Sequence, residues 1–342
     1  MPQQAPSNPL PPILLHARDG LILHQTLYVA AKLGVADQLE ETGWRSAADL
    51  ARQLEVNEDA LYRTLRLLAS QGIFEENTTR CFRNNEVSNF LRTGVPGSVR
   101  SLFIFWGSDF YYPSFGQIMH SMKTGESSRT FLSGADGFEH LRHDPEQARI
   151  FDDAMTNMSQ LVGPAIAAAY DFGAWGSLMD VGGGSGILLS HILRAHPALR
   201  GVLADQEHVL ERAREKGYLG GDLAARTTME PCNFFEHVPP GCKAYIMKSV
   251  IHDWDDDQAR IILANCRRAI PADGALLLVE WDLSRENVPS NGKFIDIVML
   301  VLTGGRERSV DEYRELMAST GFRLNRVVPT AAQFAVIEAL PV

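Results

Sequence analysis

Residues 178–195 read LMDVGGGSGILLSHILRA, and this stretch decides the fold. The apolar run Leu178–Val181 predicts a buried strand, Ile187–Ala195 predicts a helix, and the glycines between them predict a tight turn. Such a turn lets a ligand approach the backbone, and the following helix offers unpaired N–H groups. Asp205 closes the next apolar run, 25 residues beyond Asp180, where a carboxylate accepts hydrogen bonds from ribose hydroxyls. The order strand, glycine loop, helix, strand and acid therefore predicts a nucleoside-binding site.

The alternation of strand and helix patterns continues downstream. Apolar runs at Val202–Ala204, Tyr245–Met247 and Ala275–Val279 alternate with helical patterns at His208–Lys216 and Asp257–Ala269. Such alternation predicts an α/β domain with a doubly wound parallel sheet. Two closing strands are expected in Phe322–Val328 and Gln333–Ile337. The glycine loop has neither the G-x-G-x-x-G spacing of dinucleotide-binding proteins nor a Walker-type Lys-Ser/Thr.

The first hundred residues predict a mainly helical module. Apolar residues from Ile13 to Leu33, among them Leu14, Leu21 and Val29, predict a largely buried helix pair that stops at Gly34. Ser46–Gly72 has a helix-turn-helix outline, with Leu61, Leu65 and Leu68 on the inner face of the second helix, and Glu75–Arg83 resembles a β-wing. Since Glu58 and Asp59 offset Arg63 and Arg66, we expect a winged helix used for packing rather than DNA binding.

The composition of the chain indicates which kinds of partner and which cellular compartment are expected. The 342 residues carry 32 Lys+Arg against 42 Asp+Glu, a formal charge of −10, which disfavours a nucleic-acid or anionic-membrane binder. The cysteines Cys81, Cys232, Cys242 and Cys266 lack metal-site spacing, which favours a reduced intracellular protein. The longest apolar run, Ile297–Leu302, is far shorter than the roughly 20 residues that span a bilayer. Because the N-terminal residues lack signal-peptide features, we expect a cytoplasmic protein.

Residues 245–258, YIMKSVIHDWDDDQ, carry the candidate base. The predicted strand ends in Lys248, and His252 follows at the carboxyl edge of the sheet, where α/β proteins place ligands. Its place beside the predicted cofactor site favours a general base. The acids of Asp255–Asp257 favour the N-terminus of a helix over a metal site.

Together DVGGGSG (180–186), KSVIHDWDDDQ (248–258) and GGRERS (304–309) resemble, in this order, the plant-type, caffeate-like small-molecule O-methyltransferases, which have bacterial and fungal members in secondary metabolism. The resemblance covers nearly the whole chain. It implies a class I methyltransferase, Rossmann-like catalytic domain over 171–342, a winged-helix-like dimerisation domain over 13–100, and a helical region over 101–170 that contributes to the substrate pocket. It also implies a homodimer formed by the N-terminal domain, with S-adenosylmethionine as cofactor, S-adenosylhomocysteine as product, an aromatic acceptor and no metal. The first dozen residues are rich in Pro, Gln and Ser, and this composition predicts a mobile tail over 1–12.

The resemblance also implies roles for individual residues. His252 matches the base that deprotonates the substrate hydroxyl, and Glu280 and Glu307 match the two acids that orient it. The cofactor positions are Asp180, Gly182, Gly184, Asp205, Gln206, Asn233, Phe234 and Lys248. The acceptor positions are Phe151, Met155, Asp253 and Met299. The chain departs from the family where it reads Asp205-Gln206-Glu207 and Cys232-Asn233.

Several alternatives stay open at this point. Some relatives use the same scaffold for decarboxylation, hydroxylation or ring formation, and others methylate nitrogen or carbon. A ligand-responsive transcription regulator would use Ser46–Gly72 on DNA. A metal-dependent methyltransferase would need a ligand cluster, and the sequence offers no convincing one.

Overall fold

The computed structural model describes residues 11–39, 43–135, 137–281, 283 and 286–342. The chain divides after Asp109 into two compact units. Residues 1–10 of the predicted mobile tail lie outside the described residues.

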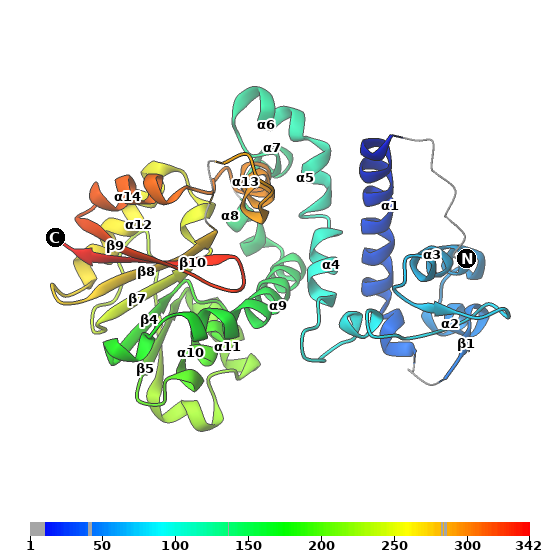
Figure 1. Ribbon diagram of the computed structural model, residues 1–342, viewed down its shortest axis with the longest axis horizontal. Coiled ribbons are helices and arrows are strands. Elements are labelled where there is room, and N and C mark those ends of the chain that lie inside the picture. Colours follow the sequence, from blue (N-terminus) through cyan, green and yellow to red (C-terminus); the bar gives the residue numbers. More distant parts are fainter. Residues whose placement is uncertain (1–10, 40–42, 136, 282, 284–285) are drawn as a thin grey trace, which may run out of the picture. The chain divides into compact units, whose positions relative to one another are not determined.

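The first unit is mainly helical (Figure 1). Its helices are α1 (Pro12–Leu33), η1 (Val35–Gln38), α2 (Ala47–Leu54), α3 (Glu58–Ser70), η2 (Ser88–Leu91) and α4 (Arg100–Trp106), and its strands are β1 (Arg45–Ser46), β2 (Glu75–Glu76) and β3 (Cys81–Arg83). The strands pair in the antiparallel order β1-β3-β2. Ser46 and Asn57 cap α2 and α3 by accepting hydrogen bonds from backbone N–H groups. The predicted winged helix is therefore present.

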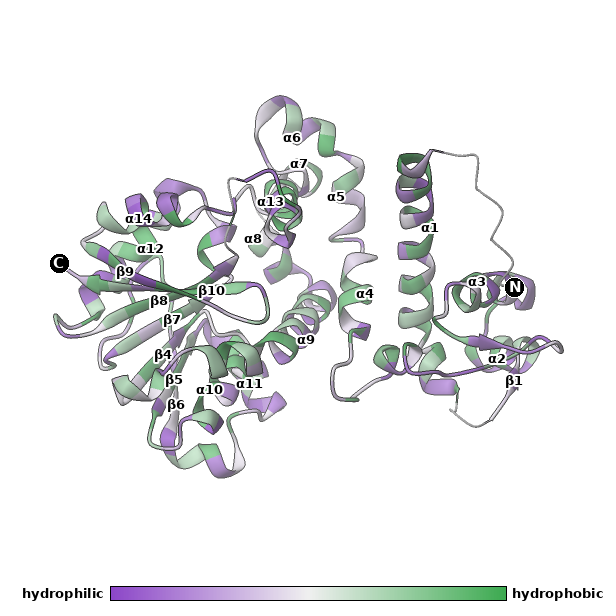
Figure 2. Cartoon of the chain, in the orientation of Figure 1, coloured by the Kyte–Doolittle hydropathy of each residue, from purple (hydrophilic) through white to green (hydrophobic). Residues whose placement is uncertain are grey.

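The prediction for residues 13–33 is wrong in two respects. They form the single helix α1 rather than a pair, since one glycine, Gly20, costs a helix only about 1 kcal/mol. Gly34 ends the helix in the left-handed conformation, as predicted. Leu14, Leu21 and Val29 are exposed rather than buried. Hydrophobic and hydrophilic bands alternate along α1 (Figure 2). The apolar residues therefore do not all lie on the helix face that packs against the rest of the first unit, and some of them stay exposed.

The second unit is built on a seven-stranded mixed sheet in the order β6-β5-β4-β7-β8-β10-β9. Its strands are β4 (Ser177–Val181), β5 (Arg200–Asp205), β6 (Thr227–Pro231), β7 (Ala244–Lys248), β8 (Ala275–Trp281), β9 (Phe322–Pro329) and β10 (Phe334–Pro341). The first five run parallel, and β9 and β10 close the sheet antiparallel. The predicted α/β class I methyltransferase fold is confirmed. The sequence reading missed β6, whose residues are mostly only half-buried.

Helices cover both faces of this sheet (Figure 1). The second unit contains α5 (Tyr112–Gly116), α6 (Ile118–Thr124), α7 (Ser128–Ser133), α8 (Gly137–His143), α9 (Pro145–Ala169), η3 (Phe172–Trp175), α10 (Ile187–Ala195), α11 (Glu207–Lys216), η4 (Gly221–Arg226), η5 (Ile251–Asp253), α12 (Asp256–Ala269), α13 (Asn291–Leu302) and α14 (Val310–Ala318). One apolar cluster joins α12 and α14 to the sheet, and a second joins α9, α10 and α11 to the opposite face. Among the described residues, no helix is long and apolar enough to cross a membrane.

The long helix α9 buries one stripe of its surface. Val162 is buried, and Met155 and Met158 are half-buried, but Leu161 is 40% exposed. The residues that α9 buries deeply are Ala154 and Ile166, which share a helical stripe with Val162. Leu161, one position before Val162, points away from that stripe.

Candidate active site

The glycine loop has a backbone that other residues would strain. Gly182, Gly184 and Gly186 have φ of 71°, 58° and 76°, in the left-handed region that favours glycine. A Cβ on Gly183 would lie 2.6 Å from the carboxyl carbon of Asp180. The loop therefore packs closely against the ends of β4 and β5. The N–H of Gly182 donates to the carbonyl of Ala204 at 2.8 Å, so the loop is also hydrogen-bonded to β5.

Asp205 is fixed at the carboxyl end of β5 by the loop itself. Its Oδ2 accepts a hydrogen bond from the N–H of Gly184 at 2.9 Å, and its Oδ1 accepts one from the N–H of Gln206 at 2.7 Å. Burial raises the pKa of this carboxyl to about 6, although both hydrogen bonds lower it. Two backbone hydrogen bonds therefore fix the orientation of this carboxylate at the end of β5.

Asp180 lies beneath the glycine loop and is 1% exposed. Its Oδ2 has no hydrogen-bond partner among the described residues. Burial, followed by the charge of Asp205, raises the pKa of Asp180 to about 7, although the charge of Lys248 opposes the shift. A buried acceptor without a partner costs free energy, and a ligand carrying N–H or O–H donors would relieve that cost. Together with the fixed carboxylate of Asp205, this unpartnered acceptor is chemically compatible with the hydroxyl and amino groups of S-adenosylmethionine.

We expect Asp180→Asn to flatten the dependence of stability on pH in the cofactor-free protein. The native carboxyl has its pKa near 7 against 3.8 in the ordinary state, so between these values the native protein holds a proton that the unfolded chain has released. The contribution of this group to stability is therefore present at low pH and is lost as pH rises toward 7, by up to about 1.4 kcal/mol per pH unit. Asparagine cannot ionise and removes this loss. Urea denaturation at pH 5, 6, 7 and 8 measures it. The exposed Asp222→Asn is the control, and an unaltered slope in Asp180→Asn would contradict the assignment.

The remaining predicted cofactor residues lie at or just after the carboxyl ends of β5, β6 and β7. A Cβ on Gly182 would lie 3.6 Å from the ring of Phe234, so this ring borders the loop. Asn233 uses its Oδ1 to accept from the N–H of Phe235, and Gln206 accepts a hydrogen bond from Arg142 on α8. Lys248, at the end of β7, donates to the Ser249 hydroxyl at 3.2 Å, and burial lowers the pKa of its ammonium group.

His252 lies on η5, directly after β7, and is 6% exposed. Its Nδ1 is 2.6 Å from Oε1 of Glu307 and 3.7 Å from Oε2 of Glu280. Its Nε2 is 3.8 Å from Oδ1 of Asp253. The structure thus brings two acids from distant parts of the sequence, Glu280 and Glu307, to one imidazole. Ser249, which turns the chain from β7 toward His252, has a φ of 53°, a left-handed conformation that often marks functional sites.

The two carboxylates beside His252 are completely buried, and neither is a surface acid. Oε1 of Glu280 accepts hydrogen bonds from the N–H groups of Val250 and Ile251, so it holds the backbone just before His252. Burial raises the pKa of Glu280 and of Glu307, and the charge of Asp296 raises that of Glu307 further. The N–H of Glu307 donates to Asp296 on α13 at 2.9 Å.

Three aromatic rings near His252 pack together, and we call them the aromatic wall: Phe138, Phe151 and Trp254. Phe138 on α8 stacks on Trp254 with centroids 5.4 Å apart, and it meets Phe151 edge-on at 6.0 Å. Met155 follows Phe151 by one turn on α9, and Met299 is buried on α13. Phe151, Met155 and Met299 are predicted from the sequence, but Phe138 and Trp254 are not. Phe138 and Trp254 are far apart in the chain, and sequence spacing does not indicate that their rings stack in the folded protein.

A second feature missed in the sequence joins α9 to the glycine loop. The Thr156 hydroxyl donates to the Ser185 hydroxyl at 3.0 Å, and Thr156 is buried. Phe151 and Met155 lie on the same helix, so this hydrogen bond links the helix that carries them to the loop.

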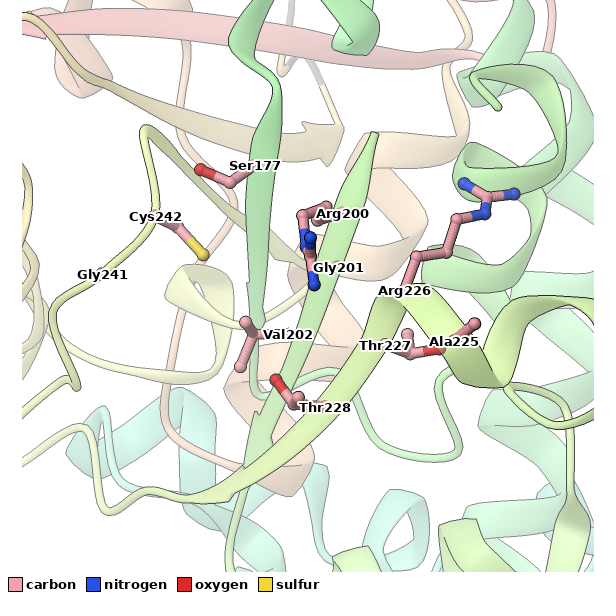
Figure 3. Close-up of a pocket in the computed structure, with 10 residues that line it drawn as sticks. All are labelled: Ser177, Arg200, Gly201, Val202, Ala225, Arg226, Thr227, Thr228, Gly241 and Cys242. Atoms are coloured by element: carbon pink, nitrogen blue, oxygen red, sulfur yellow. The ribbon is translucent and has the colours of Figure 1, made fainter. Parts of the chain in front are cut away.

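A cavity of about 190 Å³ opens at the opposite edge of the sheet (Figure 3). It is lined by the first residues of β4, β5 and β6, including Ser177, Arg200 and Thr227. Arg226, which also lines the cavity, donates to the carbonyl of Leu193 in the last turn of α10 and to the carbonyl of Leu199. Since ligands of open α/β sheets bind outside the carboxyl ends of the strands, this cavity is remote from the site described above.

Comparison with known proteins identifies the family of the chain. Residues 115–323 match the model of the O-methyltransferase domain, and residues 15–94 match that of the O-methyltransferase dimerisation domain. The chain is 38% identical to the phenazine O-methyltransferase PhzM of Lysobacter antibioticus over 98% of this chain and 97% of that protein. It is 30% identical to the phenazine-1-carboxylate N-methyltransferase of Pseudomonas aeruginosa, over 92% of each.

A solved structure extends the comparison to ligands. The O-methyltransferase NcsB1 from neocarzinostatin biosynthesis, in complex with S-adenosylhomocysteine and 1,4-dihydroxy-2-naphthoic acid, superposes with a TM-score of 0.81 at 31% identity, over 97% of this chain and 100% of that one. Sequence and fold therefore agree, and the chain belongs to the S-adenosylmethionine-dependent O-methyltransferases that carry a dimerisation domain.

Proposed function

We propose that this enzyme methylates a phenolic or enolic hydroxyl of a flat aromatic molecule in natural-product biosynthesis, with His252 as the general base. The observation that carries the proposal is the imidazole of His252, held by Glu307 at the carboxyl edge of the sheet beside the glycine loop. The wall formed by Phe138, Phe151 and Trp254 supports a flat, apolar acceptor.

S-adenosylmethionine, when bound, supplies a methyl group on a sulfonium, which is already a good electrophile. Asp205 would hold the ribose hydroxyls, and Asp180 would accept from a donor group above the loop. Phe234, Asn233, Gln206 and Lys248 would complete the surroundings of the cofactor. The chain then has to align the acceptor and remove its proton.

His252 is suited to that proton transfer. Glu307 in its ionised form would accept the Nδ1 proton of the imidazole across the 2.6 Å contact, which would leave the lone pair of Nε2 to take the proton of the acceptor hydroxyl. A phenol of pKa near 10 is mostly protonated at neutral pH, so a positioned base accelerates attack. Glu307 and Glu280 would stabilise the imidazolium that forms. Asp253, on the Nε2 side, would contact the acceptor near its hydroxyl.

We also propose that the enzyme is a homodimer and works in the cytoplasm. The match to a dimerisation domain over residues 15–94 supports a homodimer formed by the N-terminal unit, and exposed apolar residues on α1 are suited to a partner surface. The four cysteines are free thiols, as expected of a protein that works in the reducing cytoplasm.

Transfer of a labelled methyl group tests the proposal. Purified protein is incubated with S-adenosylmethionine labelled in its methyl group and with pairs of acceptors differing only in hydroxyl or amino, such as 1,4-dihydroxy-2-naphthoate and its amino analogue. Label recovered as an aromatic ether, undiminished by a chelator, is the expected result. Label on nitrogen or carbon, a product without label, or loss of activity with the chelator would each overturn it.

A further inference from the structure

Arg308 holds the backbone on both sides of His252. Its side chain is 1% exposed. One guanidinium nitrogen, Nη1, donates to the carbonyl of Ile251 at 3.1 Å, and Nη2 donates to the carbonyl of Trp254 at 2.8 Å. Nε and Nη2 also donate to Oδ1 of Asp256, at 3.0 and 2.8 Å. The residue immediately before His252 and the residue two positions after it are therefore tied to one rigid planar group.

The residues just before Arg308 grip the same loop. The N–H of Arg306 donates to the carbonyl of His252 at 2.8 Å. A Cβ on Gly305 would lie only 2.1 Å from that carbonyl oxygen, so the two backbones approach as closely as glycine permits. Glu307 places its carboxylate on Nδ1 of His252. Each residue of the 305–308 segment thus contacts the loop that carries His252: Gly305 by close backbone packing, Arg306 by its N–H, Glu307 by its carboxylate and Arg308 by its guanidinium.

The fork geometry of arginine is what this arrangement uses. The guanidinium serves the three acceptor groups of Ile251, Trp254 and Asp256 at once from donors fixed in one plane. A lysine carries the same charge on a single nitrogen with flexible donors and cannot reproduce the fork. The positive charge of Arg308 also favours the ionised form of Glu307, although burial and Asp296 raise the pKa of that carboxyl overall.

We propose that Arg308 is a positioning residue for methyl transfer, which fixes His252 against Glu307 in the geometry that proton abstraction requires. It acts through His252, and this inference rests on the proposed role of His252 as base. A displacement of about 1 Å at a reacting group can cost on the order of 100-fold in rate, so loss of the fork is expected to appear in catalysis.

Arg308→Lys tests the role of the fork, because the charge is kept. We expect kcat with 1,4-dihydroxy-2-naphthoate to fall about 10- to 100-fold, while the KM for this acceptor and the Kd for S-adenosylhomocysteine stay unchanged. Arg314→Lys is the matched control, since Arg314 is an exposed arginine of α14 that pairs with Asp311, and it should leave kcat unchanged. Wild-type kcat in Arg308→Lys would overturn the proposal.

A measurement without acceptor separates this proposal from the proposed function. In protein with ¹⁵N-labelled histidine, bound to S-adenosylhomocysteine, the Nδ1–H proton of His252 should resonate far downfield, and its loss in His252→Gln assigns it. Arg308→Lys should weaken this resonance through faster exchange with water. A resonance unchanged from wild type would overturn the role of Arg308 alone, whereas its absence from wild type would contradict the His252–Glu307 pairing itself.

A second variant carries the test if Arg308→Lys does not fold. Asp256 is 46% exposed and lies at the outer end of the guanidinium, so Asp256→Asn loosens the fork without opening the interior. A lower kcat together with a broadened Nδ1–H resonance supports the proposal. If both stay as in wild type, Arg308 does not act through this contact and the proposal is wrong.

Discussion

Replacing His252 with alanine should lower kcat by about 10²- to 10⁴-fold, the usual contribution of a positioned base. Nδ1 of His252 contacts Glu307, so Nε2 is the ring nitrogen proposed to take the proton of the phenol. Alanine has no group that can replace it. Binding of S-adenosylhomocysteine should stay unchanged, because Asp205 and the glycine loop hold their shape through contacts that do not involve His252. Steady-state kinetics with an identified acceptor at neutral pH, together with calorimetric titration of the cofactor product, measures both quantities.

The dependence on pH gives the control for this variant. Raising the pH toward the pKa of the phenol supplies the phenolate without a base, so the deficit of His252→Ala should shrink as pH rises. The exposed His16→Ala is a matched substitution and should behave as wild type. Near-normal turnover of His252→Ala at neutral pH would refute the base assignment, and alignment of the reactants alone would then explain the rate.

The cofactor side of the site could be predicted from the sequence because its signal is local. Gly182, Gly184 and Gly186 adopt left-handed φ values that few other residues accept, and Asp205 follows one strand later at the same sheet edge. Each constraint acts within about 25 residues of chain, so pattern and position suffice.

The catalytic side needed the resemblance to a known family. Glu280 and Glu307 are 28 and 55 residues from His252, and no spacing rule links a strand-end acid and a loop acid to a histidine. Their contact is created by the packing of β8 and the 305–308 segment around η5. The geometry and the complete burial of both acids now give physical support to what the resemblance implied.

Other features could not be predicted because they depend on tertiary packing. The stacking of Phe138 on Trp254, the Thr156–Ser185 hydrogen bond and the fork of Arg308 each join elements that are separate in the sequence. The error for α1 has a different cause. Its apolar residues indicated burial, and the pattern does not distinguish burial inside the chain from exposure on its surface.

Replacing Asp205 with alanine should weaken S-adenosylhomocysteine binding by about 10- to 100-fold. Hydrogen bonds to a charged group contribute about 1.5–3 kcal/mol, and each 1.4 kcal/mol is a tenfold change in Kd. Alanine also releases the N–H of Gly184, which the carboxylate holds at 2.9 Å, so the loop keeps the hydrogen bond from Gly182 to the carbonyl of Ala204 but loses this second contact with β5. Calorimetric titration of wild type and variant measures the change.

The pH dependence of binding distinguishes the two roles of Asp205. Its pKa of about 6, raised by burial, means that the ionised carboxylate forms as pH rises through 6, and ribose hydroxyls donate best to that form. Wild-type affinity should therefore increase between pH 5 and 7, and this increase should be much smaller in Asp205→Ala. Asp205→Asn keeps the shape and an acceptor oxygen but not the charge, so it should bind with intermediate affinity and little dependence on pH. If Asp205→Ala instead binds as tightly as wild type, the carboxylate serves only to anchor Gly184, and the ribose is held by other groups at the end of β5.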